Sequence, residues 1–94
     1  MEIFTVLLND KLKRGIKKLP THIVVKLFEW IDTVSHDGLS EARKQPGYHD
    51  EPLRGARKGQ RSIRLSKSYR AIYEITENDQ INMVEIMEVN KHDY

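Results

Sequence analysis

Three runs in the second half of the chain have the composition of consecutive β-strands. Arg61 to Leu65, Tyr69 to Thr76 and Ile81 to Val89 are rich in β-branched and aromatic side chains, and a short polar turn separates each run from the next. The sequence therefore predicts an antiparallel meander over residues 61–89. Such a sheet needs a partner for its apolar face, and the first half of the chain has to supply it.

Two predicted helices provide that partner. After a first strand at residues 3–8, Asn9 and Asp10 are N-cap types for a short basic helix over about 11–18, which Pro20 ends. Thr21 is the expected cap of a longer helix over 21–35. Its apolar positions have the i, i+3, i+4, i+7 spacing of a buried stripe: Val24, Leu27, Phe28, Ile31 and Val34.

The predicted architecture is a single α+β domain over residues 1–94, in the order strand, helix, helix and three strands. Both N-terminal helices pack on one face of the antiparallel sheet. Along the 69–76 strand, alternation places Ala71, Tyr73 and Ile75 on the helix side. Arg70 then stands on the open side, where we expect Arg64 to join it from the neighbouring strand.

The open face is expected to be basic, because charge is unevenly distributed along the chain. From Leu53 to Arg70 there are seven basic side chains and no acidic one, whereas the remaining residues hold nine basic and 14 acidic side chains. A concentrated positive field on an otherwise acidic small protein suits a polyanion such as a nucleic acid. The alternative is a solvated surface, but a segment without acids repels itself and weakens folding, which favours a function.

Composition excludes several classes of protein. The chain has no cysteine, hence neither a disulfide nor a thiol nucleophile, and no apolar run approaches the ~20 residues that cross a bilayer. Its apolar N-terminal stretch is short and lacks a basic lead, so we expect a soluble protein of a reducing compartment. The histidines at 22, 36 and 49 lack metal-ligand spacing, and no cofactor-binding motif occurs, so we expect neither metal nor cofactor.

Arg64 and Arg70 are the first candidates for chemistry. Two guanidinium groups on adjacent strands and on one face form a clamp for phosphate, which the planar fork of arginine binds bidentately. The alternative is structural: Arg70 forms a cross-strand ion pair with Glu85 or Glu88.

Three further candidates flank the basic segment. Glu51 precedes it, and its carboxylate is either a general base or an ion-pair partner of Arg54, which the spacing favours. His92 titrates near neutral pH and can transfer a proton, and Tyr94 can stack a base or orient a phosphate. Both follow the last predicted strand closely, at the edge of the basic face; the alternative is a frayed terminus.

Four stretches of the sequence resemble the RelE/ParE superfamily of bacterial toxins. They are Glu51-Pro52-Leu53-Arg54-Gly55, Arg61-Ser62-Ile63-Arg64-Leu65-Ser66, Tyr69-Arg70-Ala71-Ile72-Tyr73 and Val89-Asn90-Lys91-His92-Asp93-Tyr94. The predicted order of elements is also that of the superfamily. The resemblance is clear over residues 51–94, and over residues 1–50 it rests on the helical hairpin.

Within the superfamily the chain is most similar to the RelE, YoeB and HigB endonucleases, which act on mRNA in the decoding site of the bacterial ribosome, against 16S rRNA. The resemblance implies a cytoplasmic toxin, silenced by an antitoxin, that cleaves mRNA without metal by attack of the 2′-hydroxyl. It implies Glu51 as the base, Arg70 on the phosphate, His92 as the acid and Tyr94 as a substrate contact, and Arg64 could join Arg70 on the phosphate. Asp93, inserted between His92 and Tyr94, departs from the family's His-Tyr pair.

The remaining basic side chains are the expected contacts to RNA and the ribosome: Arg54, Arg57, Lys58, Arg61, Lys67 and, after the last strand, Lys91. We expect Arg57, Lys58 and Arg61 to reach phosphates from a loop or a strand start without fixed geometry. The main alternative function is a ParE-like poison of DNA gyrase with the same fold and no nuclease activity. A third is an RNA- or ribosome-binding module without catalysis.

Overall fold

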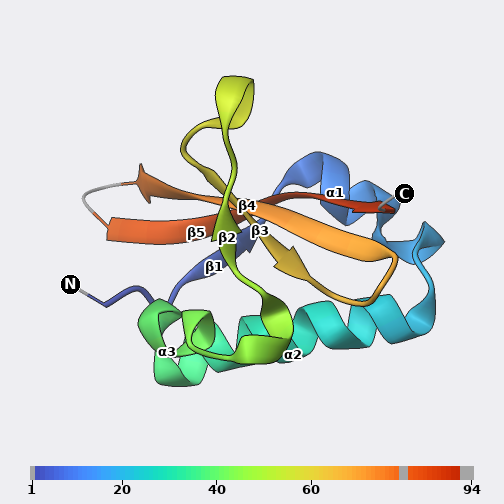
Figure 1. Cartoon of the computed structure of the whole chain (residues 1–94), viewed down its shortest axis with the longest axis horizontal. Coiled ribbons are helices and arrows are strands. Elements are labelled where there is room, and N and C mark those ends of the chain that lie inside the picture. The colour runs from blue at the N-terminus through green and yellow to red at the C-terminus, as the bar shows by residue number, and fades with distance from the viewer. Residues whose placement is uncertain (1, 79–80, 92–94) are drawn as a thin grey trace.

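The computed structural model describes residues 2–78 and 81–91 (Figure 1). These residues contain five strands, β1 (Val6–Leu8), β2 (Glu51–Pro52), β3 (Gln60–Arg64), β4 (Tyr69–Asn78) and β5 (Ile81–Lys91). The strands form one sheet in the order β1-β5-β4-β3-β2. β3, β4 and β5 are antiparallel neighbours, which confirms the predicted meander. β1 adds parallel to β5, and β2 adds antiparallel to β3 at the opposite edge.

Helices precede the meander. They are α1 (Asp10–Gly15), the 3-10 turn η1 (Ile16–Lys18), α2 (Thr21–Asp37) and α3 (Leu39–Arg43), and two further 3-10 turns, η2 (Pro46–Tyr48) and η3 (Gly55–Arg57), lie on either side of β2. The Asn9 side chain caps α1 by accepting a hydrogen bond from the Lys11 backbone amide at 2.9 Å, as predicted. The N-cap of α2 is Pro20 rather than Thr21, because Thr21 is already helical. None of the described helices is long and apolar enough to span a bilayer.

α2 covers one face of the sheet, and its buried stripe differs from the predicted one. The residues that face the sheet are Ile23, Leu27, Trp30 and Val34, each 0% exposed, whereas Phe28 is 43% exposed. The reason is Trp30, whose ring packs against that of Tyr73 on β4, with the centroids 5.1 Å apart. An indole is the largest apolar group available, so the helix turns the stripe that contains it toward the core.

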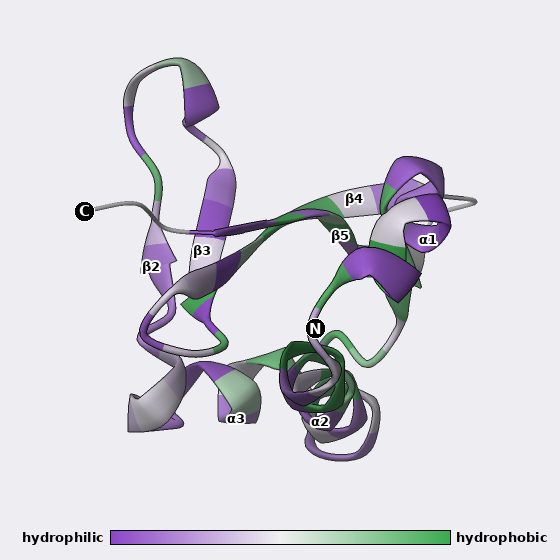
Figure 2. Cartoon of the chain, turned by 90° about the vertical axis from the view of Figure 1, so that its right-hand side faces the viewer, coloured by the Kyte–Doolittle hydropathy of each residue, from purple (hydrophilic) through white to green (hydrophobic). Residues whose placement is uncertain are grey.

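The other face of the sheet is left open. Ala71 and Tyr73 are fully buried on the helix side, as alternation predicted, and Arg70 points away from the helices. Ile75, the third residue predicted on the helix side, is 45% exposed. The connection from β2 to β3 rises on the side of the sheet away from α2, and both views show it standing beside the open face (Figures 1 and 2).

The N-terminal segment around Glu2 packs against the C-terminal end of α2 at Gly38. This glycine has φ 93°, and its amide donates to the Val34 carbonyl at 2.9 Å to close the helix. One oxygen of the Glu2 carboxylate accepts from the amides of Ser40 at 2.9 Å and Ile3 at 3.0 Å. A Cβ atom at position 38 would lie 2.4 Å from Glu2 Cγ, so the junction fits only glycine.

We therefore expect Gly38→Ala to lower the free energy of unfolding by about 1–3 kcal/mol, because alanine is strained at this φ and its methyl group displaces Glu2. Gly47→Ala is the matched control: nothing lies within 4 Å of a Cβ there, and its φ is ordinary. That variant should change stability by less than about 1 kcal/mol. Urea titration of both variants tests the difference, and equal stabilities would contradict it.

Candidate active site

Two arginines stand side by side on the open face. In the β3–β4 ladder Arg64 is the direct partner of Arg70, and Arg70 in turn faces Asn90 on β5. Directly opposed residues project from the same face, so the two guanidinium groups share it, as expected for a phosphate clamp. Like charges in this arrangement are destabilising, and the pair is therefore unfavourable in the free protein unless other groups compensate it.

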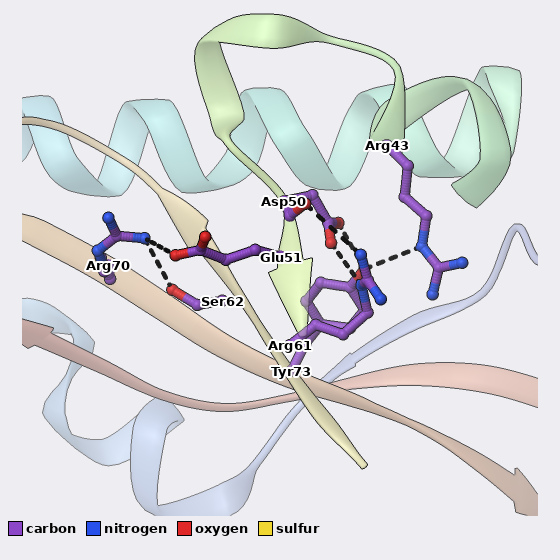
Figure 3. Close-up of polar contacts among 7 residues, drawn as sticks. All are labelled: Arg43, Asp50, Glu51, Arg61, Ser62, Arg70 and Tyr73. Atoms are coloured by element: carbon purple, nitrogen blue, oxygen red, sulfur yellow. Dashed lines mark hydrogen bonds and ion pairs between the residues drawn. The ribbon is translucent and has the colours of Figure 1, made fainter. Parts of the chain in front are cut away.

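Arg70 is held by side chains from β2 and β3. Its Nη1 atom donates to Ser62 Oγ at 3.1 Å and to Glu51 Oε1 at 3.4 Å (Figure 3). Ser62 lies on β3 and is only 2% exposed, so its hydroxyl holds one edge of the guanidinium against the sheet. The Glu51 side chain is 61% exposed, which makes its ion pair with Arg70 a weak one that an anion can displace.

These contacts differ from the alternative ion pair considered for Arg70 and from the pair that the spacing favoured for Glu51. Arg70 pairs with Glu51 rather than with Glu85 or Glu88, and Glu51 does not pair with Arg54. The cause is β2, which the sequence did not reveal because it has two residues and one is proline. β2 places Glu51 directly opposite Ser62, on the open face and next to Arg70.

Arg57 also differs from the expected unconstrained loop cation. It forms an ion pair with Glu88 of β5, and its Nε donates to Gln60 Oε1 at 2.9 Å. Because β4 lies between β3 and β5, the Arg57 side chain reaches across the open face to make this contact. Both partners are more than a third exposed, so the pair contributes little stability and leaves Arg57 able to exchange Glu88 for a phosphate.

Arg61 lies on the opposite side of the sheet, against expectation. It is the ladder partner of Tyr73, and its Nε donates to Asp50 Oδ1 at 2.5 Å. The Asp50 side chain is fully buried, and its second oxygen accepts from the Tyr73 hydroxyl at 2.6 Å (Figure 3). Arg43 Nε donates to that hydroxyl at 3.4 Å. Arg61 is therefore part of a structural network that sequence patterns alone did not indicate.

The other predicted RNA contacts are distributed around the site. Arg54 and Lys58 are exposed on the β2–β3 connection, and Lys67 is exposed in the turn between β3 and β4. Lys91 is exposed and faces Tyr69, so it projects on the opposite side from Arg70. His92 and Tyr94 lie outside the described residues. The described chain ends at Lys91, which follows the ladder partner of Arg70.

The site has the groups for polyanion chemistry. Within residues 2–78 and 81–91, no cluster of three or more acidic or histidine side chains comes together. A carboxylate, two guanidinium groups and a buried hydroxyl converge instead. This set can hold a phosphate and take a proton from a neighbouring hydroxyl.

The Asp50 network makes a prediction about alkaline pH. Burial, and then the hydrogen bond to Asp50, raise the pKa of Tyr73 to about 12. A raised pKa stabilises the fold at pH values below about 10, and that contribution is lost as the pH rises from about 10 to 12. We expect Tyr73→Phe to be less stable than the native protein at pH 7 and to lose less stability above pH 10. Urea unfolding from pH 7 to 11.5 measures this, with Tyr69→Phe as control; parallel pH profiles for Tyr73→Phe and the native protein would contradict it.

Solved structures resemble this fold over almost its full length. One chain of the RelBE2 toxin–antitoxin complex from Mycobacterium tuberculosis has a TM-score of 0.66 and 25% identity, with 96% of this chain and 99% of that chain covered. The YoeB/ParE toxin from Agrobacterium tumefaciens has a TM-score of 0.63 and 17% identity, covering 95% and 99%. A chain of the YoeB–YefM complex from Staphylococcus aureus has a TM-score of 0.65 and 14% identity, covering 96% and 98%.

Sequence comparison adds nothing to this result, since no family model and no curated protein matches the chain. The structural neighbours carry the same mixed sheet with helices, and they confirm the resemblance inferred from the four sequence stretches. The chain has the fold shared by the RelE, YoeB, YafQ and ParE toxins of type II toxin–antitoxin systems.

Proposed function

We propose that the protein is the toxin of a type II toxin–antitoxin system and that it cleaves mRNA on the ribosome without metal. The observation that carries the proposal is the cross-strand pair Arg64–Arg70 on an open sheet face, with the Glu51 carboxylate 3.4 Å from Arg70. The likeness to toxin–antitoxin structures supports the toxin part. The nuclease part rests on Glu51, Arg70, His92 and Tyr94, which resemble the site residues of the RelE, YoeB and HigB branch apart from the inserted Asp93.

The reaction is an intramolecular transesterification of the RNA, in which phosphorus forms a bond to the ribose 2′-oxygen and its bond to the 5′-oxygen of the next nucleotide breaks. Glu51 takes the proton of a ribose 2′-hydroxyl, whose oxygen attacks the adjacent phosphorus. Arg64 and Arg70 bind the non-bridging oxygens, which become more negative in the transition state. His92 gives a proton to the departing 5′-oxygen, so that the products are a 2′,3′-cyclic phosphate and a free 5′-hydroxyl. Tyr94 stacks against a base beside the scissile bond.

Substrate binding changes the partner of Arg70. In the free protein the Glu51 carboxylate occupies the side of Arg70 that a phosphate would take, and this surface ion pair is weak. A phosphate that binds Arg70 displaces Glu51, which is thereby released to act as a base. Ser62 stays in place, because it is buried and contacts the guanidinium from the sheet.

The exposed basic side chains around the open face supply affinity for the messenger and for 16S rRNA: Arg54, Lys58, Lys67 and, once it exchanges Glu88, Arg57. Lys91 is not part of this set, because it projects on the opposite side from Arg70. Arg61 is left out of this set, since Asp50 holds it on the opposite side of the sheet. In a bacterial cytoplasm such a protein needs an antitoxin, which we propose as its resident partner.

The division of labour in the site is testable by mutation. Arg70→Ala and His92→Gln should lower the rate of cleavage about 10²–10³-fold while leaving ribosome binding almost unchanged, because both groups act mainly on the transition state. Arg70→Lys should rescue only in part, since it keeps the charge and loses the fork. The measurement is single-turnover cleavage of mRNA on saturating ribosomes, with a melting curve for each variant. Intact message together with broken DNA would favour gyrase poisoning instead.

Glu51→Gln should separate binding from chemistry. The amide has no charge to hold Arg70 and no basic oxygen to accept a proton, so cleavage should fall about 10²–10⁴-fold while ribosome affinity stays equal or rises. Glu41→Gln is the control, because that glutamate lies on α3 and pairs with Lys44. Equal loss of affinity and rate in Glu51→Gln would show that Glu51 is only a structural partner of Arg70.

A further inference from the structure

The open face carries two like-charged pairs of opposite sign. Arg64 and Arg70 are direct partners at one end of the β4 strand, and Glu74 and Glu85 are direct partners farther along it. Side chains alternate between the two faces along a strand, so Arg70 and Glu74 project from the same face of β4. The two pairs therefore share one face of the sheet. Arg70 and Glu74 are four positions apart along β4, which is ~13 Å in an extended strand.

Within the described residues, the acidic pair is not neutralised by any basic side chain. The Glu74 carboxylate accepts a hydrogen bond from the side-chain amide of Gln60 at 3.4 Å. The Glu85 carboxylate accepts one from the side-chain amide of Asn9 at 3.2 Å. Both amides are uncharged, so two negative charges remain opposite each other. Like charges in direct opposition are destabilising, and neither pair improves the fold of the free protein.

Two further features surround the acidic end. The Arg57–Glu88 ion pair lies between the basic and acidic ends, since Glu88 is the ladder partner of Ile72. Leu7 on β1 is 44% exposed and is the partner of Glu85, so an apolar side chain borders the acidic pair on the same face. The face therefore offers, in order, positive charge, a weak ion pair, negative charge and an apolar edge.

We infer that this face binds a segment of the antitoxin that carries both signs of charge, with acidic side chains toward Arg64 and Arg70 and basic ones toward Glu74 and Glu85. The inference rests on the proposed function, which supplies the antitoxin. An RNA strand fits the basic end only, because its phosphates are repelled by the two glutamates. A protein segment satisfies both ends and places an apolar side chain on Leu7.

The acidic pair then has a separate task from the arginines. Basic side chains of the antitoxin can form ion pairs with Glu74 and Glu85, whereas the phosphates of RNA cannot. The acidic pair therefore favours the antitoxin over RNA on this face. Relief of both like-charge pairs adds to the stability of the complex, and charge complementarity over ~13 Å speeds association. Removal of the glutamates should therefore affect the two binding partners in opposite directions.

The test is binding of the purified product of the adjacent gene to the full chain, with association rates measured at two salt concentrations. The Glu74→Gln/Glu85→Gln variant should bind it about tenfold more weakly, mainly through slower association with a flatter salt dependence. Glutamine keeps the oxygen that accepts from Asn9 or Gln60. The control is Glu29→Gln/Glu77→Gln, which removes equal charge from α2 and from the opposite side of β4 and should bind like the native chain.

The same variants are then bound to ribosomes. Glu74→Gln/Glu85→Gln should bind ribosomes as tightly as the native chain or more tightly, whereas Arg64→Gln/Arg70→Gln should weaken antitoxin binding while changing ribosome binding little. A melting temperature at or above the native value shows that the glutamine variant is folded. The inference would be overturned if Glu74→Gln/Glu85→Gln bound the antitoxin as tightly as the control variant, or if it lost ribosome binding rather than antitoxin binding. Neither result would contradict the proposed function. A native chain that does not bind the gene product would overturn the proposed function as well.

Discussion

The site depends on a buried carboxylate next to it. Asp50 is fully buried and joins the connection that precedes β2 to Arg61 and Tyr73 of the sheet. A buried charge is tolerated only when it is paired and hydrogen-bonded, and here both oxygens have partners. Asp50 and Glu51 are consecutive and project to opposite sides of the sheet. One residue therefore anchors the edge strand while the next reaches the open face beside Arg70.

The basic segment has several roles rather than one. Arg61 is part of the fold, because it compensates Asp50 on the helix side of the sheet. Arg57 and Arg70 hold exposed carboxylates that an incoming anion can replace. Arg54, Lys58 and Lys67 are exposed around the site. A charge count alone treats these residues as equivalent, whereas their partners and exposure separate structural cations from those that are available to a ligand.

The meander and the side of Arg70 could be predicted from sequence because alternation is a local property of a strand. The buried stripe of α2 could not be predicted, since α2 has two overlapping apolar stripes. The contact of Trp30 with Tyr73 determines which of them is buried. The ion pair of Glu51 with Arg70 also needed the structure: it depends on a two-residue strand without a readable pattern. The roles of His92 and Tyr94 remain predictions from the resemblance.

The order of the strands in the sheet has a consequence for folding during synthesis. β5 follows every other strand in the sequence, yet it lies inside the sheet, between β4 and β1, and pairs with both. β1 emerges from the ribosome first and has no partner until β5 appears, about 75 residues later. Contacts between segments this distant in sequence form late, because closing a long loop costs conformational entropy before the new contacts stabilise the chain. The Arg64–Arg70 pair on β3 and β4 therefore gains its complete supporting sheet only after β5 has been made.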